Sequence, residues 1–278
     1  MEDYSTWVGR SETREDVASA APLASLAALL DHDVSPWAPG MVPPLGHWLY
    51  FLPTARQSAI GEDGHPRRDA HGLLPPVPLS RRMWAGSRID FLAPVPLGAA
   101  LARVTTIDAI KPKRGASGDL LFVTLCHEIS ADGAPAIREE QDIVFRGAAG
   151  AAPVPGAAPA AVVTPEPADA VRSITPDPVL LFRYSALTFN AHRIHYDRDY
   201  ARDVEGYAGL VVHGPLIATL LMDHALRAGL SPRHFAFRAE APLIDGAPFD
   251  LCLAHDAEGA RLWARDAAGR TTMRATLV

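Results

Sequence analysis

The chain is poor in cysteine and has no long apolar segment. Its two cysteines, Cys126 and Cys252, both fall in strand-like apolar runs, which is typical of buried thiols rather than of a disulfide framework. No apolar run approaches the roughly twenty residues of a membrane-spanning helix. The first residues also lack the basic and then hydrophobic pattern of a signal peptide. We therefore expect a cytoplasmic protein with no membrane association.

Positively charged residues are fewer than negatively charged ones. Lysine and arginine total 26 against 32 aspartates and glutamates, a net charge of −6, which opposes nonspecific binding to nucleic acid. A Gly-rich phosphate loop and a Gly-x-Ser-x-Gly motif are both absent, so nucleotide-binding enzymes and serine hydrolases find no support. With 48% hydrophobic and 21% charged residues, the composition is that of an ordinary globular enzyme.

One internal repeat organises the chain. The pattern Ala-Pro-x-x-x-Gly-Ala at residues 93–99 returns 148 residues later, at 241–247. A strand-like run precedes each copy and three follow it, with Gly and Asp at the hairpin positions. These runs are residues 86–92, 101–110, 120–129 and 137–145, and then 234–240, 249–255, 260–265 and 271–278. The repeat predicts a duplicated unit in which a helix is followed by antiparallel strands, an α+β fold.

An Ala-, Pro- and Gly-rich stretch lies between the two copies. It shows no hydrophobic periodicity and is typical of a linker. We predict a first domain at 1–147, a linker at 148–171 and a second domain at 172–278. Apolar periodicity predicts helices over 14–30, over 45–60 as the central helix of the first unit with a kink or start at Pro53, and over 215–228.

Most of the polar chemistry is concentrated in residues 184–216, which contain Asn190, His192, His195 and His213. The sequence His213-Gly-Pro opens an apolar run, and a proline suits the first position of a helix, where its missing N–H is not needed. A helix starting there would direct free backbone N–H groups and a partial positive charge towards whatever His195 faces. The pattern indicates an acid/base group beside an oxyanion site.

This stretch resembles the MaoC-like hydratases of the hot-dog superfamily, whose signature is Asp-x-Asn-Pro-x-His followed by His-Gly at a helix start. Residues 190–195 match the first motif, with His195 at the catalytic histidine and Asn190 where the family usually has a catalytic aspartate. Residues 185–197, with the segments 48–53, 74–79 and 82–87, resemble one branch. That branch contains the type 2 hydroxyacyl-thioester dehydratases and the mesaconyl-CoA and itaconyl-CoA hydratases. The resemblance covers most of residues 40–278.

The resemblance implies a double hot-dog fold, in which two antiparallel sheets each wrap a central helix and pack side by side. It also implies a hydro-lyase that adds water reversibly to an α,β-unsaturated acyl thioester. The substrate would be an acyl-CoA, with an acyl-carrier-protein thioester less favoured, and the coenzyme A of the substrate would be the only cofactor. The first half is expected to be a degenerate hot-dog that shapes the acyl pocket with Trp48, Tyr50 and Trp84. The resemblance leaves open whether the protein forms a homo-oligomer.

Histidine suits both proton transfers of this reaction because its unperturbed pKa lies near 6.5. His195 is therefore the predicted acid/base, and the N–H of Gly214 the predicted donor to the thioester oxygen. Asn190 cannot transfer protons, so we expect it to hold the water or to orient His195. We expect His192 and His213 to contact the substrate. A metal is not expected, because the His-x-x-His spacing of His192 and His195 lacks a third ligand.

Arg193 replaces the usual proline of the motif. A guanidinium beside the active histidine would suit a substrate carboxylate, because its planar fork bonds both oxygens. This favours a short dicarboxylic acyl group such as mesaconyl (3-methylfumaryl) or itaconyl. The alternatives are a 3-hydroxyacyl-thioester dehydratase of fatty acid synthesis, a thioesterase and a noncatalytic thioester-binding protein.

Basic residues outside this motif are less specific. They gather at 111–114 and around Trp84, at Arg81, Arg82 and Arg88. Each group is either a solvated surface or a site that attracts the phosphates of coenzyme A or of a carrier-protein arm. The sequence leaves both interpretations open.

Overall fold

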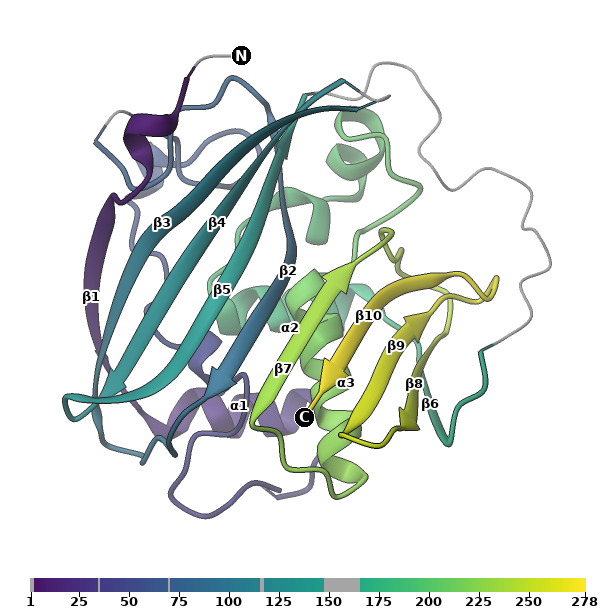
Figure 1. The fold of residues 1–278 in the computed structure, drawn as a ribbon. Helices are drawn as coiled ribbons and strands as arrows, with labels where there is room; N and C mark the ends of the chain where they lie inside the picture. Colours follow the sequence, from purple (N-terminus) through teal and green to yellow (C-terminus); the bar gives the residue numbers. More distant parts are fainter. Residues whose placement is uncertain (1–2, 35, 70, 116–117, 148–165) are drawn as a thin grey trace. The chain divides into compact units, whose positions relative to one another are not determined.

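A computed structural model describes residues 3–34, 36–69, 71–115, 118–147 and 166–278 (Figure 1). The chain divides into two compact units, Met1–Ala148 and Ala149–Val278. The predicted linker lies largely outside the described residues. Its last two positions already belong to a strand, β6 (Ala170–Ile174). Among the described residues, no helix has the length and apolarity needed to cross a bilayer.

The first unit contains a five-stranded antiparallel sheet (Figure 1). Alternate side chains of its long strands enter one core, as expected for a sheet with one buried face. Leu121, Val123 and Leu125 of one strand meet Ile107 and Phe145 of its neighbours there. The strands are β1 (Ser11–Val17), β2 (Arg81–Phe91), β3 (Ala100–Gly115), β4 (Gly118–Ala131) and β5 (Ala134–Arg146), in the order β1-β3-β4-β5-β2.

The second unit repeats this order around a long helix. Its strands β6, β7 (His234–Ala239), β8 (Phe249–His255), β9 (Ala260–Arg265) and β10 (Thr271–Leu277) follow the order β6-β8-β9-β10-β7. Helix α3 (Gly214–Arg227) packs against β8, β9 and β10 and is buried at every position from 216 to 225. Figure 1 shows α3 against one face of these strands. A sheet wrapped around one helix is the hot-dog arrangement.

The repeat seen in the sequence has a structural counterpart. Gly98 and Gly246 lie 148 residues apart and have φ angles of +88° and +87°, a backbone conformation that glycine adopts without strain. Two residues before each glycine an isolated β-bridge forms, from Pro96 to Met41 in the first unit and from Ile244 to Val211 in the second. Met41 and Val211 are therefore equivalent positions of the two units.

This equivalence shows that the described residues of the first unit contain no counterpart of α3. Where α3 begins in the second unit, the first has Pro43 and Pro44 and then a single 3-10 turn, η2 (Gly46–Leu49). The two prolines have no N–H to donate, and Leu45 has a φ of +65°, outside the right-handed helical region. The predicted central helix over 45–60 was wrong, since the remainder of this segment forms only one further 3-10 turn, η3 (Gln57–Ala59).

Two other elements differ from the prediction. The helix expected over 14–30 is shorter, because residues 11–17 pair with β3 as an edge strand and only α1 (Ala20–Leu29) is helical. Helix α2 (Pro178–Thr188) was not predicted. Its start has an ordinary signal, since Asp177 accepts a hydrogen bond from the N–H of Leu180 and Pro178 occupies the first position. Cys252 is buried and Cys126 partly buried, and both are free thiols.

Candidate active site

His195 is fixed by the backbone of a neighbouring segment. It ends a single 3-10 turn, η4 (Arg193–His195), and its buried ring places Nδ1 2.7 Å from the carbonyl oxygen of Val211. A carbonyl only accepts, so Nδ1 carries the hydrogen, and in the neutral ring Nε2 keeps its lone pair. The N–H of Val211 donates in turn to the carbonyl of Ile194 at 2.9 Å. The structure thus holds the tautomer that a general base at Nε2 requires.

His213 stacks on His195. The ring centroids lie 3.6 Å apart with an interplanar angle of 20°, and Nε2 of His213 lies 2.8 Å from the hydroxyl oxygen of Ser185 on α2. Burial, and after it the nearby His195 and His192, lower the pKa of His213 well below its usual value. The His213 ring is therefore neutral at physiological pH. It restrains the orientation of the His195 ring without placing a positive charge beside it.

Ser185→Ala should destabilise the second unit by about 1–3 kcal/mol, the cost of leaving a buried polar group unpaired. The variant removes the partner of His213 Nε2, and Nδ1 of the same ring already has no hydrogen-bond partner. Urea unfolding of the wild type and the variant measures the change. Ser231→Ala, at an exposed position of the same unit, is the control. Equal unfolding free energies for Ser185→Ala and the wild type would contradict this assignment.

Helix α3 starts immediately after His213. The N–H groups of its first turn have no acceptor within the helix, and Pro215 has none to offer, so Gly214 and Leu216 supply the donors at this end. The first intrahelical bond runs from Ile217 to the carbonyl of His213 at 3.1 Å. Because His213 lies on the ring of His195, this helix end can stabilise negative charge on an oxygen near His195. The role of Gly214 as that donor stays a prediction.

Asn190 and His192 belong to the turn that joins α2 to η4. The side-chain oxygen of Asn190 accepts a hydrogen bond from the N–H of His192 at 3.0 Å, so the amide shapes the backbone that presents His195. The ring of His192 lies edge-on to that of His195, with centroids 5.3 Å apart. The part of the chain that the structure describes contains no cluster of three metal-binding side chains. The predicted water-holding role of Asn190 remains untested.

Arg193 is engaged by a carboxylate of its own segment. Its Nε and one terminal nitrogen donate to the same oxygen of Asp197 at 3.1 and 2.7 Å, and the guanidinium lies 4.2 Å from the ring centroid of Tyr200. A substrate carboxylate would have to share this guanidinium with Asp197. The spacing of four residues signalled such a pair in the sequence. A role for Arg193 in reading the substrate stays a prediction.

Trp48 and Trp84 meet in the first unit beside a buried carboxylate, Glu139. Trp48 donates from its indole nitrogen to Glu139 at 2.9 Å, and the two indole rings lie 5.0 Å apart, edge to face. Trp84 donates to the hydroxyl of Ser87 at 2.9 Å, and that hydroxyl donates to the second oxygen of Glu139 at 2.7 Å. His47 completes the set, with Nε2 donating to Glu139 at 3.0 Å. Both tryptophans therefore help to solvate a buried charge.

Tyr50 does not join this cluster. Its ring is buried, and its hydroxyl donates to the carbonyl of Ser19 at 2.8 Å. The predicted roles of Trp48, Tyr50 and Trp84 in lining the acyl pocket stay predictions.

Several residues of these clusters were not predicted from the sequence, and three of them show why. Val211 acts through its carbonyl, which every residue type has, so no sequence signal could identify it. Ser185 lies inside the recognised motif, but nothing in its spacing indicated that it would meet His213. Glu139 had a usable signal, since an acidic residue falls on the inward-facing side of a predicted strand.

Comparisons with known protein sequences match most of the chain. The family model of the type 2 hydroxyacyl-thioester dehydratases matches residues 45–245. The mesaconyl-C(4)-CoA hydratase of Chloroflexus aurantiacus is 47% identical over 278 residues, which cover 99% of this chain and 97% of that protein.

Solved structures show the same fold. A MaoC-like dehydratase from Phytophthora capsici superposes with a TM-score of 0.67 at 15% identity, over 97% of this chain and 95% of that one. A Mycobacterium tuberculosis protein with a double hotdog fold superposes with a TM-score of 0.59 at 15% identity, over 97% and 96%. The double hot-dog fold and the predicted resemblance are confirmed, except that the described residues of the first unit contain no central helix. The chain belongs to the type 2 hydroxyacyl-thioester dehydratase family of MaoC-like hydratases and dehydratases.

Proposed function

We propose that this protein is an enoyl-CoA hydratase that adds water reversibly to mesaconyl-C(4)-CoA, with no cofactor besides the coenzyme A of its substrate. The proposal rests on the 47% identity to the Chloroflexus hydratase along almost the whole chain. The buried His195, whose Nδ1 lies 2.7 Å from the carbonyl oxygen of Val211 and therefore carries the hydrogen, supports the same reaction class. We place the enzyme in the cytoplasm, together with its acyl-CoA substrates.

His195 carries both proton transfers in this proposal. Nε2 takes a proton from water as the water oxygen bonds to the β carbon, and the electrons of the double bond move towards the thioester oxygen. The N–H of Gly214 donates to that oxygen as its negative charge develops. Protonated Nε2 then delivers its proton to the α carbon, which leaves a β-hydroxyacyl thioester and neutral His195. Asn190 supports this cycle by holding the turn before His195.

We further propose that the second unit alone carries the catalytic groups. The bridge equivalence of Met41 and Val211 puts Pro43 and Pro44 at the positions of His213 and Gly214. A proline has neither a ring nitrogen that takes up protons nor an N–H for an oxyanion. The first unit then acts as a degenerate hot-dog that shapes the binding site.

One assay separates this function from its alternatives. The protein is incubated with mesaconyl-C(4)-CoA, itaconyl-CoA and crotonyl-CoA while loss of the enoyl absorbance and release of free thiol are followed together. A hydratase removes the absorbance and leaves the thioester intact. A thioesterase releases thiol, and a binding protein changes neither signal. Thiol release at the rate of enoyl loss, or no reaction at all, would overturn the proposal.

The fatty-acid alternative has its own support, because the matching family model is that of the hydroxyacyl-thioester dehydratases. Arg193→Ala tests it. If Arg193 reads a substrate carboxylate, kcat/KM should fall roughly tenfold or more for mesaconyl-C(4)-CoA, the scale of a charge-assisted hydrogen bond. It should change little for a medium-chain enoyl-CoA. Asp197→Ala is the matched variant, because it removes the carboxylate that accepts hydrogen bonds from Arg193 and keeps the guanidinium itself. An equal loss on both substrates would show that Arg193 only supports the fold.

A further inference from the structure

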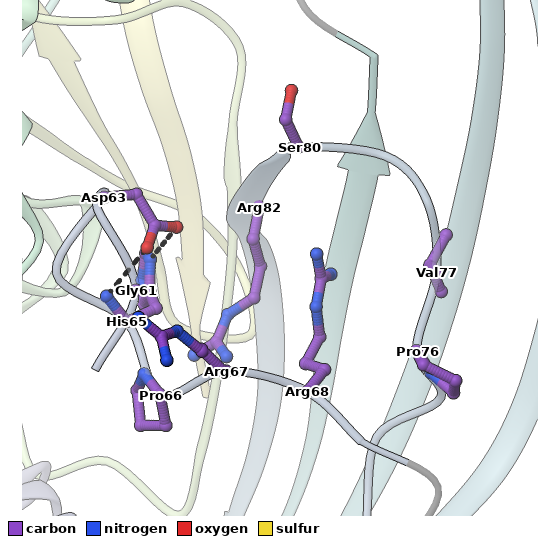
Figure 2. A pocket seen from close by; sticks show the side chains of 10 residues that line it. All are labelled: Gly61, Asp63, His65, Pro66, Arg67, Arg68, Pro76, Val77, Ser80 and Arg82. Atoms are coloured by element: carbon purple, nitrogen blue, oxygen red, sulfur yellow. Dashed lines mark hydrogen bonds and ion pairs between the residues drawn. The ribbon is translucent and has the colours of Figure 1, made fainter. Parts of the chain in front are cut away.

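The first unit contains a cavity of about 360 Å³ that lies entirely within residues 61–82 (Figure 2). This volume is in the range of small-molecule sites. The walls come from the loop before β2 and from the start of that strand, and Figure 2 shows Arg82 directed from β2 towards the loop that carries Asp63 and His65. Pro66, Pro76 and Val77 add apolar surface. The catalytic proposal uses none of these residues.

The charge of the cavity is strongly positive. Arg67, Arg68 and Arg82 line it against a single carboxylate, Asp63. Burial lowers the pKa of His65, although its hydrogen bond to Asp63, 3.0 Å long, acts in the opposite direction. His65 therefore adds little charge at neutral pH. Three guanidinium groups and one carboxylate leave two net positive charges around the cavity.

Arg68 has a donor that the protein does not use. Arg68 donates from one terminal nitrogen to the carbonyl of Leu79 at 3.1 Å and lies over the ring of Phe145, but its other terminal nitrogen is buried without a hydrogen-bond partner. Burial and the neighbouring charge of Arg68 lower the pKa of Arg82 to about 10, so Arg82 stays protonated at neutral pH. An anion would accept from these donors and offset the repulsion between the two cations.

We propose that this cavity binds a phosphate monoester such as the 3′-phosphate of coenzyme A. A phosphate monoester carries a charge near −2 at neutral pH, which matches the two net positive charges better than a carboxylate does. Its oxygens accept bidentate hydrogen bonds from arginine. The volume leaves room for the ribose beside the apolar residues. The identity of the ligand rests on the proposed function.

Coenzyme A and dephospho-coenzyme A test the site directly, because the two differ only in the 3′-phosphate. Calorimetry should show that the wild-type protein binds coenzyme A about ten- to a hundredfold more tightly, the scale of hydrogen bonds to a charged group. Arg82→Gln should remove most of this difference and leave the affinity for dephospho-coenzyme A unchanged. That unchanged affinity also shows that the variant is folded. Arg67→Gln, at an exposed position of the cavity wall, should give a smaller loss in the same direction.

Arg56→Gln removes an exposed arginine of the same unit outside the cavity and should keep the full preference. Millimolar inorganic phosphate should reduce the preference in the wild type if the pocket recognises the phosphate itself. Equal wild-type affinity for the two ligands would overturn the proposal, and so would a preference that survives in both Arg82→Gln and Arg67→Gln. A preference found in a protein that fails to hydrate mesaconyl-C(4)-CoA would support the site and refute the proposed function.

Discussion

Replacing His195 with alanine should lower the rate of hydration by roughly two to four orders of magnitude, the usual scale for a positioned general acid/base. The proposed mechanism gives both proton transfers to Nε2 of this residue, so alanine removes the group that takes up and returns the proton. The loss should appear in kcat, because alanine leaves the start of α3 and the first unit unchanged. Initial rates with saturating mesaconyl-C(4)-CoA measure the effect.

Two further variants keep this test specific. His255→Ala removes an exposed histidine of the same unit that pairs with a surface carboxylate, Asp169, and should retain wild-type turnover. His195→Gln should be as slow as His195→Ala, because an amide can donate and accept hydrogen bonds but cannot carry a proton at neutral pH. Near wild-type turnover in a folded His195→Ala protein would show that another group is the base.

Glu139→Gln should destabilise the first unit by about 3 kcal/mol, the lower end of the range for breaking a buried ion pair from one side. Glu139 is 3% exposed and accepts hydrogen bonds from His47, Trp48 and Ser87. The glutamine has the same size but no charge. The amide N–H₂ of the glutamine would also replace one carboxylate oxygen, so the donors that bonded that oxygen would face another donor. Urea unfolding at neutral pH measures the loss, with the exposed Glu128→Gln on β4 as control.

The pH dependence of this effect has a definite sign. Burial alone would raise the pKa of Glu139, but the hydrogen bond and charge of His47, with His127 and Ser87, lower it to about 2. In the unfolded chain a glutamate titrates near pH 4.3. The ionised carboxylate therefore stabilises the fold fully above about pH 5, and this contribution is lost as the pH falls towards 2.

The difference in unfolding free energy between wild type and Glu139→Gln should accordingly shrink between pH 5 and the lowest pH at which both proteins still fold. Glu128→Gln should follow the wild type throughout. A Glu139→Gln penalty that stays constant over this range would show that the carboxylate is not the charged centre of the cluster.

The strands of both units could be predicted because their apolar residues alternate between well-marked turns. The expected runs at 249–255 and 260–265 coincide with β8 and β9, and the helix expected at 215–228 differs from α3 by one residue at each end. The edge strands β1 and β6 were missed. Each pairs on one side only within its unit, so β1 keeps charged residues such as Arg14 and Asp16 that hide a strand pattern.

The candidate site also contains a part that could be predicted from the sequence and a part that could not. Its histidines and the start of α3 stand in one recognisable motif, and the structure stacks the ring of His213 on that of His195. The partners that fix them come from tertiary contacts. The carbonyl of Val211 and the hydroxyl of Ser185 reach the rings only after α2, η4 and α3 have packed together. Asp197 lies four residues after Arg193 in the sequence. This spacing does not decide whether the guanidinium of Arg193 bonds Asp197 or a carboxylate of the substrate.

Hydration in water enriched in ¹⁸O tests the central claim most directly. The protein is incubated with mesaconyl-C(4)-CoA, and the products are identified by mass spectrometry before and after hydrolysis of the thioester. At early times we expect one solvent oxygen in the β-hydroxyl group of an intact CoA thioester, formed by the wild type and almost absent with His195→Ala. Solvent oxygen found instead in a free acid with release of coenzyme A, or product formed equally by both proteins, would contradict the account.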